Sequence, residues 1–362
     1  MPIVTITGIA MRPGRAEAAG VADGWRVFEQ TPRFHGVTSA GILPERIPLD
    51  AIRLARQRIK DAAVRTPLLR LPYDGPREIW LKLETLQPVG SFKIRGARNA
   101  VASLDSATLA RGVVTASAGN MALGLAWCAR EHNAPFTAIV PDHAPDAKLR
   151  ALERLGARLV PLPFDRWWRV LEERGFDGVE GTFVHPVADA AVMAGNGTIA
   201  LEILEDLPYV EKVLVPFGGG GLACGIASGL KPLEPGARVI GCEIETAAPL
   251  TPSLAAGAPQ GVTYTATFVD GIGSSRLLPD MWPMIRALVE GAVTVSLEET
   301  ADAIRTLAER THVVAEGAGA VPVAAALSGR AGGGTICCVV SGGNIDASRL
   351  AAILSRAPNA TT

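Results

Sequence analysis

The sequence lacks an excess of charge of either sign, and it lacks a long apolar run. Lysine and arginine together number 35 against 36 for aspartate and glutamate in 362 residues, so the formal net charge is -1. Without a basic surplus there is no electrostatic reason to expect a nucleic-acid partner. No apolar segment approaches the roughly 18 residues of a membrane-spanning helix, so no membrane partner is expected. These absences, with 48% apolar residues, indicate a soluble enzyme.

A secretory signal and a disulfide framework are also missing. The first twenty residues have neither a basic start nor a sustained apolar stretch, and Arg12, Arg15 and Glu17 interrupt them. We therefore expect a cytoplasmic protein. The five cysteines are odd in number and lie inside apolar segments, which predicts reduced, buried thiols.

From about Glu78 onward, short apolar runs alternate with helical patterns, which is typical of parallel strands joined by crossover helices. The predicted fold class is therefore α/β. The expected strands are residues 79–83, 113–116, 136–140, 158–162, 213–216, 239–243 and 335–340. The expected helices are residues 95–104, 121–131, 147–155, 196–206, 297–310 and 348–355. Residues 1–45 have no firm period and are expected to form an N-terminal extension that covers the body or a partner subunit.

The most informative residue is Lys93, in the segment GSFKIRGA that begins at residue 90. A lysine forms a Schiff base with an aldehyde when its amine is neutral, and burial beside an apolar ring such as Phe92 lowers the pKa in that direction. Ser91 is expected to cap the helix that opens here, which places Lys93 in the first turn. A lone lysine beside phenylalanine is otherwise a common surface arrangement. The argument for chemistry at Lys93 therefore depends on three further loops.

The second loop is Ser117-Ala118-Gly119-Asn120, between the strand expected at 113–116 and a helix from Met121. Ligands of parallel sheets gather at the carboxyl ends of the strands. Exposed amides at the start of the helix can bind a carboxylate, and the Asn120 side chain can donate to a ring hydroxylate. Taken alone, the loop is equally consistent with an ordinary capped turn.

The third loop holds the glycines Gly218, Gly219, Gly220 and Gly221, after the strand expected at 213–216 and before a helix from Leu222. Consecutive glycines let backbone amides converge on a phosphate, and the start of a helix adds partial positive charge. The loop has neither the Lys-Ser/Thr ending of a nucleoside-triphosphate loop nor a suitably placed acid for a dinucleotide fingerprint. It therefore predicts a site for the phosphate of a small cofactor.

The fourth loop begins with Ser341, at the carboxyl end of the strand expected at 335–340. A hydroxyl group there can hydrogen-bond a pyridine nitrogen without forcing it to be protonated. An unprotonated ring withdraws electrons less strongly, which favours prompt loss of a leaving group from the β-carbon. The four loops together predict a site for an aldehyde, a ring hydroxyl, a phosphate and a pyridine nitrogen.

With these motifs in place, the chain resembles the pyridoxal phosphate enzymes of fold type II, which are tryptophan synthase β-like, and within them the threonine/serine dehydratase branch. The matching segments run from Leu81 to Asp346 and are LKLETLQPVGSFKIRGA, TASAGNMALG, HPVADAAVMAGNGTIALEI, VPFGGGGLACG, VAEGAGA and VVSGGNID. The resemblance implies two lobes, each with a mostly parallel twisted sheet flanked by helices. Residues 46–111 and 182–362 would form a large cofactor-binding domain and residues 112–181 a small domain.

The resemblance also implies a role for each loop residue. Lys93 would hold pyridoxal 5'-phosphate and later remove the α-proton, while Phe92 flanks the ring. Asn120 would meet the ring hydroxyl and Ser341 the ring nitrogen. The phosphate would lie on the glycine loop and the start of its helix, and the substrate carboxylate on the second loop and Met121. The partner implied is a small amino acid, and the assembly implied is a homodimer.

Two departures from the family pattern concern proton transfer and metal binding. Serine racemases of this branch usually carry a second serine where this chain has Ala118, so racemisation is not expected. The divalent-cation site of the family commonly uses a Glu, a carbonyl and an Asp. Glu243 and Ala247 match the first two, but Pro249 stands in the third position. No metal is predicted.

Further departures concern the substrate. Met121 and Leu123 replace the usual His and Gln, and Val187 and Ala188 replace Phe and Asp. These changes remove polar groups and one aromatic ring, which favours a roomier and more apolar pocket, although Met121 and Leu123 are equally consistent with packing beneath the loop.

The function predicted is a dehydration and deamination of a β-hydroxy-α-amino acid to a 2-oxo acid and ammonia, the activity of an ammonia-lyase. The substrate would be threonine, serine or a bulkier apolar analogue such as phenylserine. One alternative is β-replacement or threonine synthase-like chemistry, in which a second nucleophile captures the intermediate. Another is a non-catalytic protein that only binds the cofactor.

Overall fold

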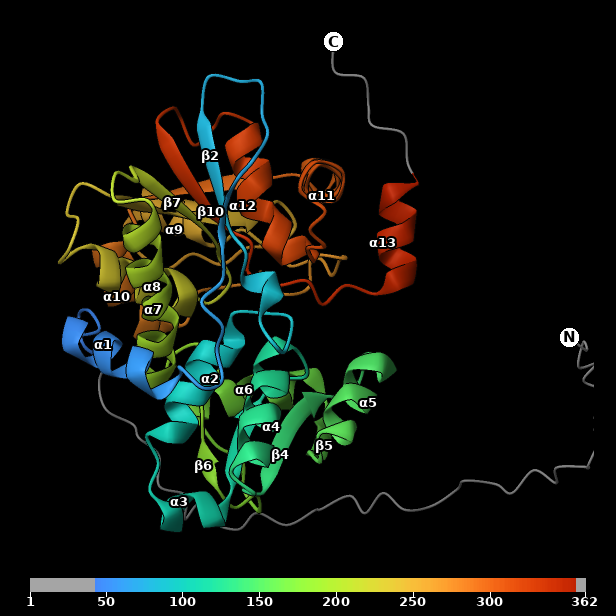
Figure 1. Cartoon of the computed structure of the whole chain (residues 1–362). Coiled ribbons are helices and arrows are strands. Elements are labelled where there is room, and N and C mark those ends of the chain that lie inside the picture. The colour runs from blue at the N-terminus through green and yellow to red at the C-terminus, as the bar shows by residue number, and fades with distance from the viewer. Residues whose placement is uncertain (1–42, 356–362) are drawn as a thin grey trace, which may run out of the picture. The chain divides into compact units, whose positions relative to one another are not determined.

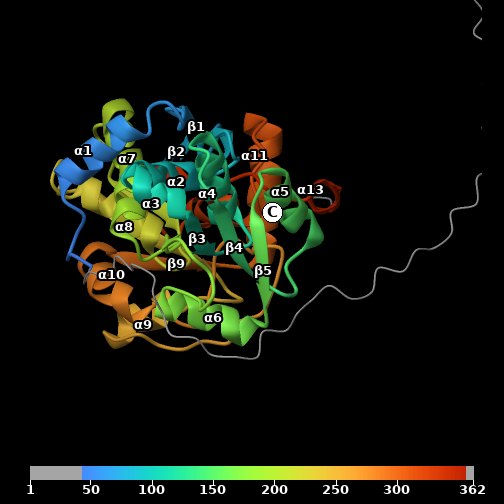
Figure 2. The same cartoon turned by 90° about the horizontal axis from the view of Figure 1, so that it is seen from below.

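The strands and helices of the chain form an α/β structure with two sheets. The computed structural model describes residues 43–355. Figure 1 shows the strands of the larger sheet above those of the smaller sheet, and Figure 2 shows the same fold from below. The larger sheet has the order β1-β2-β10-β7-β8-β9, formed by Leu68–Arg70, Glu78–Lys82, Thr335–Val339, Lys212–Pro216, Arg238–Ile244 and Gly291–Val295. The smaller sheet has the order β5-β4-β3-β6, formed by Arg158–Leu162, Phe136–Pro141, Val113–Ala116 and Thr182–Phe183. β1 is antiparallel to β2, and the other neighbouring strands are parallel.

Helices join and cover these strands. The helices α1 to α7 are Leu49–Arg58, Lys93–Ala102, Ser106–Arg111, Asn120–Glu131, Asp146–Arg154, Phe164–Glu173 and Ala190–Asp206. The helices α8 to α13 are Gly221–Leu230, Leu250–Ala256, Trp282–Leu288, Leu297–Thr311, Gly317–Leu327 and Ala347–Leu354. Two short 3-10 helices, η1 at Glu84–Leu86 and η2 at Pro279–Met281, complete the described secondary structure.

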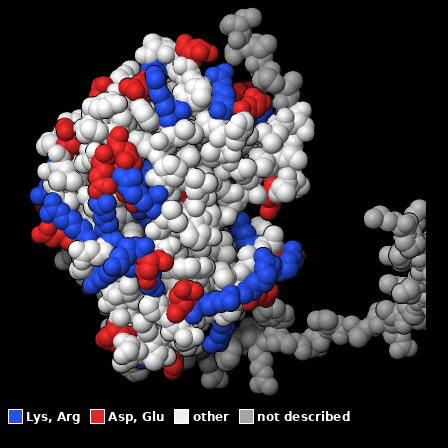
Figure 3. Space-filling model, in the orientation of Figure 1, with Lys and Arg blue, Asp and Glu red and all other residues white. Residues whose placement is uncertain are grey.

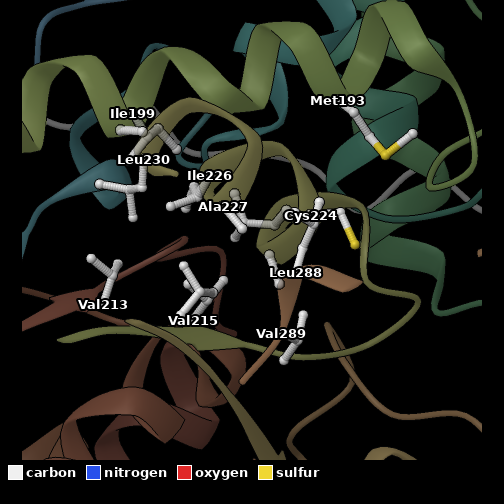
Figure 4. Packing of buried hydrophobic residues seen from close by; sticks show 14 of the residues in the cluster. Met193, Ile199, Val213, Val215, Cys224, Ile226, Ala227, Leu230, Leu288 and Val289 are labelled. Atoms are coloured by element: carbon white, nitrogen blue, oxygen red, sulfur yellow. The ribbon is translucent and has the colours of Figure 1, made fainter. Parts of the chain in front are cut away.

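The core lies on both faces of the larger sheet because side chains alternate between the faces of a strand. Val213 and Val215 of β7 pack against α7, α8 and α10, as Figure 4 shows, whereas Leu214 packs on the other face with α11 and α12. The predicted state of the cysteines is confirmed: all five are buried and unpaired. Burial raises the pKa of the Cys224 thiol to about 12, so it stays protonated.

All seven expected strands are present, and each of their ends differs from the expected one by no more than one residue. The helix α12 was missed because its segment, GAGAVPVAAAL, is almost wholly buried and therefore has no polar face to reveal a helical period. The helix α7 begins at Ala190 rather than at residue 196, since the Asp189 side chain accepts from the amides of Ala191 and Val192.

The predicted domains stay a prediction. Of the N-terminal extension expected at 1–45, only residues 43–45 belong to the described part. The strand β6 at Thr182–Phe183 pairs with β3, so the smaller sheet continues two residues beyond the boundary expected at 181.

The surface seen in Figure 3 carries lysine and arginine interspersed with aspartate and glutamate, without a large area of one sign. Among the described helices, none is long and apolar enough to cross a membrane.

Candidate active site

The parallel pairing of β2, β10 and β7 brings three of the four predicted loops to one edge of the larger sheet. The loops after β2 and β10 also bond to each other. The Phe92 amide donates to the Ser341 carbonyl at 2.9 Å, and the Gly343 amide donates to the Gly90 carbonyl at 2.9 Å. The segment that ends at Lys93 and the segment that begins at Ser341 therefore run side by side.

The structure places every predicted site residue on the wall of one cavity of about 370 Å³, a volume within the range of small-molecule sites. Further residues from the turn 186–187, from α5 and α6, and from the segment 264–272 complete the wall. The predicted residues that meet in the cavity are Phe92, Lys93, Ser117, Ala118, Gly119, Asn120, Met121, Gly218, Gly219, Gly220, Gly221, Leu222 and Ser341.

Lys93 is the first residue of α2, and its amine is held inside the cavity. Its Nζ donates to the Pro186 carbonyl oxygen at 2.9 Å and lies 5.1 Å from the centre of the Phe92 ring. Burial lowers the pKa of Lys93 to about 8, against the opposing charge of Glu316. The amine is therefore neutral in a large fraction of molecules near pH 8, which is the form that attacks an aldehyde.

The expected capping of α2 by Ser91 was wrong. Ser91 does not cap α2: the residue before the helix is Phe92, and the Ser91 hydroxyl is buried without a hydrogen-bond partner in the described part of the chain. The backbone bonds to the Ser341 loop hold the segment instead. Sequence reasoning had no means of finding these bonds, because they join residues about 250 positions apart.

His185 is a functional neighbour that the sequence analysis did not select, although it lies in the quoted segment HPVAD. Its Nδ1 accepts from the amides of Val187 and Ala188 at 3.0 and 2.8 Å. Burial, with Arg174 and Lys93 nearby, lowers the pKa of His185 to about 3, so the ring is neutral. The imidazole thus shapes the turn whose Pro186 carbonyl receives the Lys93 amine.

Two helix starts face the cavity without side-chain caps. The helix α8 begins at Gly221 after Gly220, whose φ of +92° is the left-handed conformation that glycine adopts readily. An added Cβ on Gly221 would lie 2.7 Å from the Val187 carbonyl oxygen, so the loop packs tightly on the turn behind it. The helix α4 likewise begins at Asn120 with no side-chain cap. The free backbone amides at the start of each of these two helices can bind one anion.

The cavity also fits the ring of the predicted cofactor. Ser341 lines it, and no hydrogen bond to the Ser341 hydroxyl is formed within residues 43–355. The side chain is 3% exposed, so an unpaired hydroxyl there is available to a ring nitrogen. A lysine amine with a lowered pKa, a glycine loop at an uncapped helix start and an unpartnered hydroxyl group together fit the aldehyde, the phosphate and the ring nitrogen of pyridoxal phosphate.

Glu316 is the second residue that sequence reasoning missed, although it stands in the quoted segment VAEGAGA. It precedes α12, lines the cavity and accepts from Asn120 Nδ2 at 2.8 Å. Burial raises the pKa of Glu316 to about 7 with help from Asp270, while the bond from Asn120 and the charge of Lys148 act against this.

Not every substituted position faces the cavity. Met121 and Val187 line it, but Leu123 packs in the core of the smaller sheet and Ala188 in the core of the larger one. Leu123 and Ala188 therefore do not enlarge the pocket, contrary to the expectation from the sequence. At the position that corresponds to the family's divalent-cation site, the Glu243 carboxylate accepts hydrogen bonds at the start of α9, from two amides and a hydroxyl group.

Four aromatic side chains at the wall were not selected from the sequence. Phe164 and Trp167 come from α6, His143 from the turn between β4 and α5, and Tyr264 from the segment after α9. The rings of Phe164 and Trp167 are 5.6 Å apart, and those of His143 and Phe164 are 5.9 Å apart. They had no sequence signal because no motif contains them.

The fold and this cavity are those of an enzyme that binds a small aldehyde cofactor. Comparison with known proteins agrees, since the family model described as "Pyridoxal-phosphate dependent enzyme" matches residues 59–342. An L-threonine ammonia-lyase of Geobacter sulfurreducens is 41% identical over 321 residues, which cover 86% of this chain and 79% of that protein.

Solved structures agree as well. Maize serine racemase superposes with a TM-score of 0.76 at 32% identity, covering 84% of this chain and 96% of that one. The threonine deaminase of T.th. superposes with a TM-score of 0.73 at 34% identity, covering 83% of this chain and 99% of that one.

The chain belongs to the pyridoxal-phosphate dependent enzymes, as predicted, and its fold is fold type II. Within this fold type it falls in the threonine/serine dehydratase branch and is an ammonia-lyase whose cofactor is pyridoxal phosphate. The roles of the individual site residues stay predictions.

Proposed function

We propose that this enzyme converts a β-hydroxy-α-amino acid, of the threonine and serine type, to a 2-oxo acid and ammonia. The observation that carries the proposal is the Lys93 amine, with a pKa lowered to about 8, in a cavity with two uncapped helix starts. When bound, pyridoxal phosphate supplies an electron-withdrawing ring conjugated to the α-carbon of the amino acid.

The Lys93 amine is suited to take the α-proton, because near neutral pH it exchanges a proton easily with its surroundings. The bond electrons left on the α-carbon then expel the β-hydroxyl, which leaves as water with one added proton. The resulting enamine becomes an imine, and one water hydrolyses it to the 2-oxo acid and ammonia. The net reaction needs no oxidant and no second nucleophile.

The start of α4 is suited to hold the substrate carboxylate. The amides of Ala118, Asn120 and Met121 form no hydrogen bond in residues 43–355, whereas the Gly119 amide donates to Ser117 Oγ at 3.2 Å. Free amides and the positive end of the helix favour an anion. Ala118 places a methyl group on this wall, which supports elimination over racemisation because a methyl group cannot exchange a proton.

For the substrate side chain we propose a bulky apolar group, with phenylserine as the example. Support comes from Phe164, Trp167 and Tyr264 on the cavity wall, with Met121 behind the carboxylate site. The Trp167 Nε1 already donates to the Ile139 carbonyl at 3.1 Å, so its remaining surface is apolar. Burying a phenyl ring against these side chains is worth about 2 kcal/mol, or more than tenfold in kcat/KM.

A substrate panel tests both levels of this proposal. Serine, threonine and phenylserine are incubated with the cofactor-loaded enzyme, and 2-oxo acid and ammonia are measured without any added nucleophile. Formation of neither product from any of the three contradicts the ammonia-lyase function and favours β-replacement or a binding role. Equal kcat/KM for all three contradicts the bulky substrate alone.

A matched pair of variants separates specificity from damage to the fold. Trp167→Ala should lower kcat/KM for phenylserine about tenfold or more and leave serine nearly unaffected, since only the larger side chain reaches the aromatic wall. Trp168→Ala, in the same helix α6 but absent from the cavity wall, should not change the ratio between the two substrates.

The homodimer and the cytoplasmic location expected from the sequence, and the division into a large and a small domain, remain proposals. The two sheets support the division, because each has its own apolar core clusters.

A further inference from the structure

Asn120 is held by two side chains that lie outside the predicted site residues. Its Nδ2 donates to Glu316 Oε1 at 2.8 Å, and its Oδ1 accepts from Asn344 Nδ2 at 2.8 Å. Glu316 is 6% exposed and close to the Ser341 loop, since an added Cβ on Gly342 would lie 2.6 Å from Glu316 Oε1. The carboxylate can reach Asn120 only because residue 342 has no side chain.

The orientation of a side-chain amide is decided by its partners, because its oxygen and nitrogen ends have nearly the same shape. Asn344 Nδ2 donates not only to Asn120 but also to the Val89 carbonyl oxygen, at 2.9 Å. A backbone carbonyl can only accept, so the nitrogen of Asn344 must be on this side. Asn344 therefore presents a donor to Asn120, and the Asn120 oxygen must face it.

The hydrogen bond between Asn120 and Glu316 requires the same orientation of the Asn120 amide. An ionised carboxylate can only accept, so above the Glu316 pKa of about 7 the ionised group requires the Asn120 nitrogen on its side. The series from Val89 through Asn344 and Asn120 to Glu316 thus has one consistent direction. One N–H of Asn120 is used by Glu316, and the second has no partner among the described residues, although Asn120 lines the cavity.

We propose that Glu316 and Asn344 are positioning residues that fix the Asn120 amide so that it offers an N–H, and not its oxygen, to the ring hydroxyl of pyridoxal phosphate. A donor stabilises the ionised ring oxygen, whereas a carbonyl oxygen in the same place repels it. Burial raises the pKa of Glu316, and the charged groups that face it from neighbouring elements are Asp270, Lys148 and Lys93.

The decisive variant is Asn344→Asp, which keeps the size of the side chain but removes its N–H groups. The new carboxylate would draw the Asn120 nitrogen toward itself and turn the Asn120 oxygen to the cavity. Asn344 is exposed, so the fold should tolerate the change. We expect the Kd of the cofactor-free protein for pyridoxal phosphate to rise about tenfold or more, and the visible absorbance band of the bound cofactor to change its pH dependence.

A double-mutant cycle with Asn120→Ala shows whether the effect acts through Asn120. Asn344→Asp should change the Kd by less than about twofold in the Asn120→Ala background. Glu316→Gln keeps an acceptor oxygen for Asn120 and should retain the parent's spectrum, whereas Glu316→Met should resemble Asn120→Ala.

The proposal is overturned if Asn344→Asp leaves both the Kd and the spectrum unchanged. It is also overturned if the variant weakens binding equally with and without Asn120. Melting temperatures of the cofactor-free variants report general damage separately. The test requires no turnover, so it does not depend on which substrate the enzyme prefers.

Discussion

Replacing Arg95 with methionine tests how the lysine-bearing helix α2 is held in place. Arg95 is 1% exposed and donates to both oxygens of Glu84, at 2.8 Å each, and to both oxygens of Glu202, at 2.7 and 2.8 Å. Lys82 donates to Glu202 at 2.6 Å, so two cations face two carboxylates in the interior. Burial alone would raise the pKa of Glu84, yet the Arg95 guanidinium holds it below its ordinary value.

The magnitude follows from the charges left behind. Methionine has a similar reach but no charge, so Arg95→Met leaves two buried carboxylates facing one ammonium group. Removing one partner of a buried ion pair costs about 3 to 5 kcal/mol. Solvent cannot screen the remaining charges, because Glu84 and Lys82 are 0% exposed. We expect the free energy of unfolding to fall by this amount.

The assay is denaturant unfolding of the cofactor-free protein, so that cofactor binding does not contribute to the result. Arg98→Met is the matched control. Arg98 lies on the same helix, but its partners are the exposed His132 and Asp61, which is 57% exposed, so the expected loss is within about 1 kcal/mol. Adding Glu84→Gln to Arg95→Met should recover part of the loss, because it removes a stranded charge. A loss for Arg95→Met no larger than that for Arg98→Met would refute the reasoning.

Three further predictions concern the cavity. The rate at which the cofactor-free protein captures pyridoxal phosphate should rise with pH through about 8, the pKa of Lys93. Lys93→Ala should show no visible absorbance band, and stopped-flow absorbance measures both the rate and the band. Gly221→Ala should weaken cofactor affinity about tenfold or more, since the new methyl group would lie 2.7 Å from the Val187 carbonyl; Gly333→Ala, which meets no atom within 4 Å, is the control in the same titration. Burial raises the pKa of Glu316 from 4.5 to about 7. The free energy of unfolding should therefore fall by about 3 kcal/mol as pH rises between these two values. Glu316→Gln should therefore make the cofactor-free protein more stable than the parent at pH 8 but not at pH 4, and an equal difference at both values contradicts the assigned pKa.

Much of the fold was predictable because its signals are local. Short apolar runs such as residues 113–116 predict buried strands of a parallel sheet, whatever their place in the strand order. Glycines such as Gly220 indicate a left-handed backbone conformation that other residues adopt rarely. The four loops follow strands in the sequence, and parallel strands end at a common edge. Their meeting in one cavity was therefore predictable as well.

Some local inferences failed because another contact had the stronger effect. Ser91 has a side chain that commonly caps helices, but it does not cap α2, because backbone hydrogen bonds to the Ser341 loop hold this segment instead. Leu123 lies in α4, the helix that follows the second predicted loop, yet its side chain points into the core of the smaller sheet. Position in the sequence did not reveal which way either side chain points.

The sequence by itself determined the class of fold and the four loops that meet in one cavity with Lys93, because strand ends and glycine runs depend on neighbouring residues. Only the tertiary structure decided the lowered pKa of the Lys93 amine, the aromatic wall and the direction of the Asn120 amide. Asn120 lies 196 residues from Glu316 and 224 residues from Asn344. Burial and hydrogen-bond direction arise only when such distant segments pack together, so no local pattern records them.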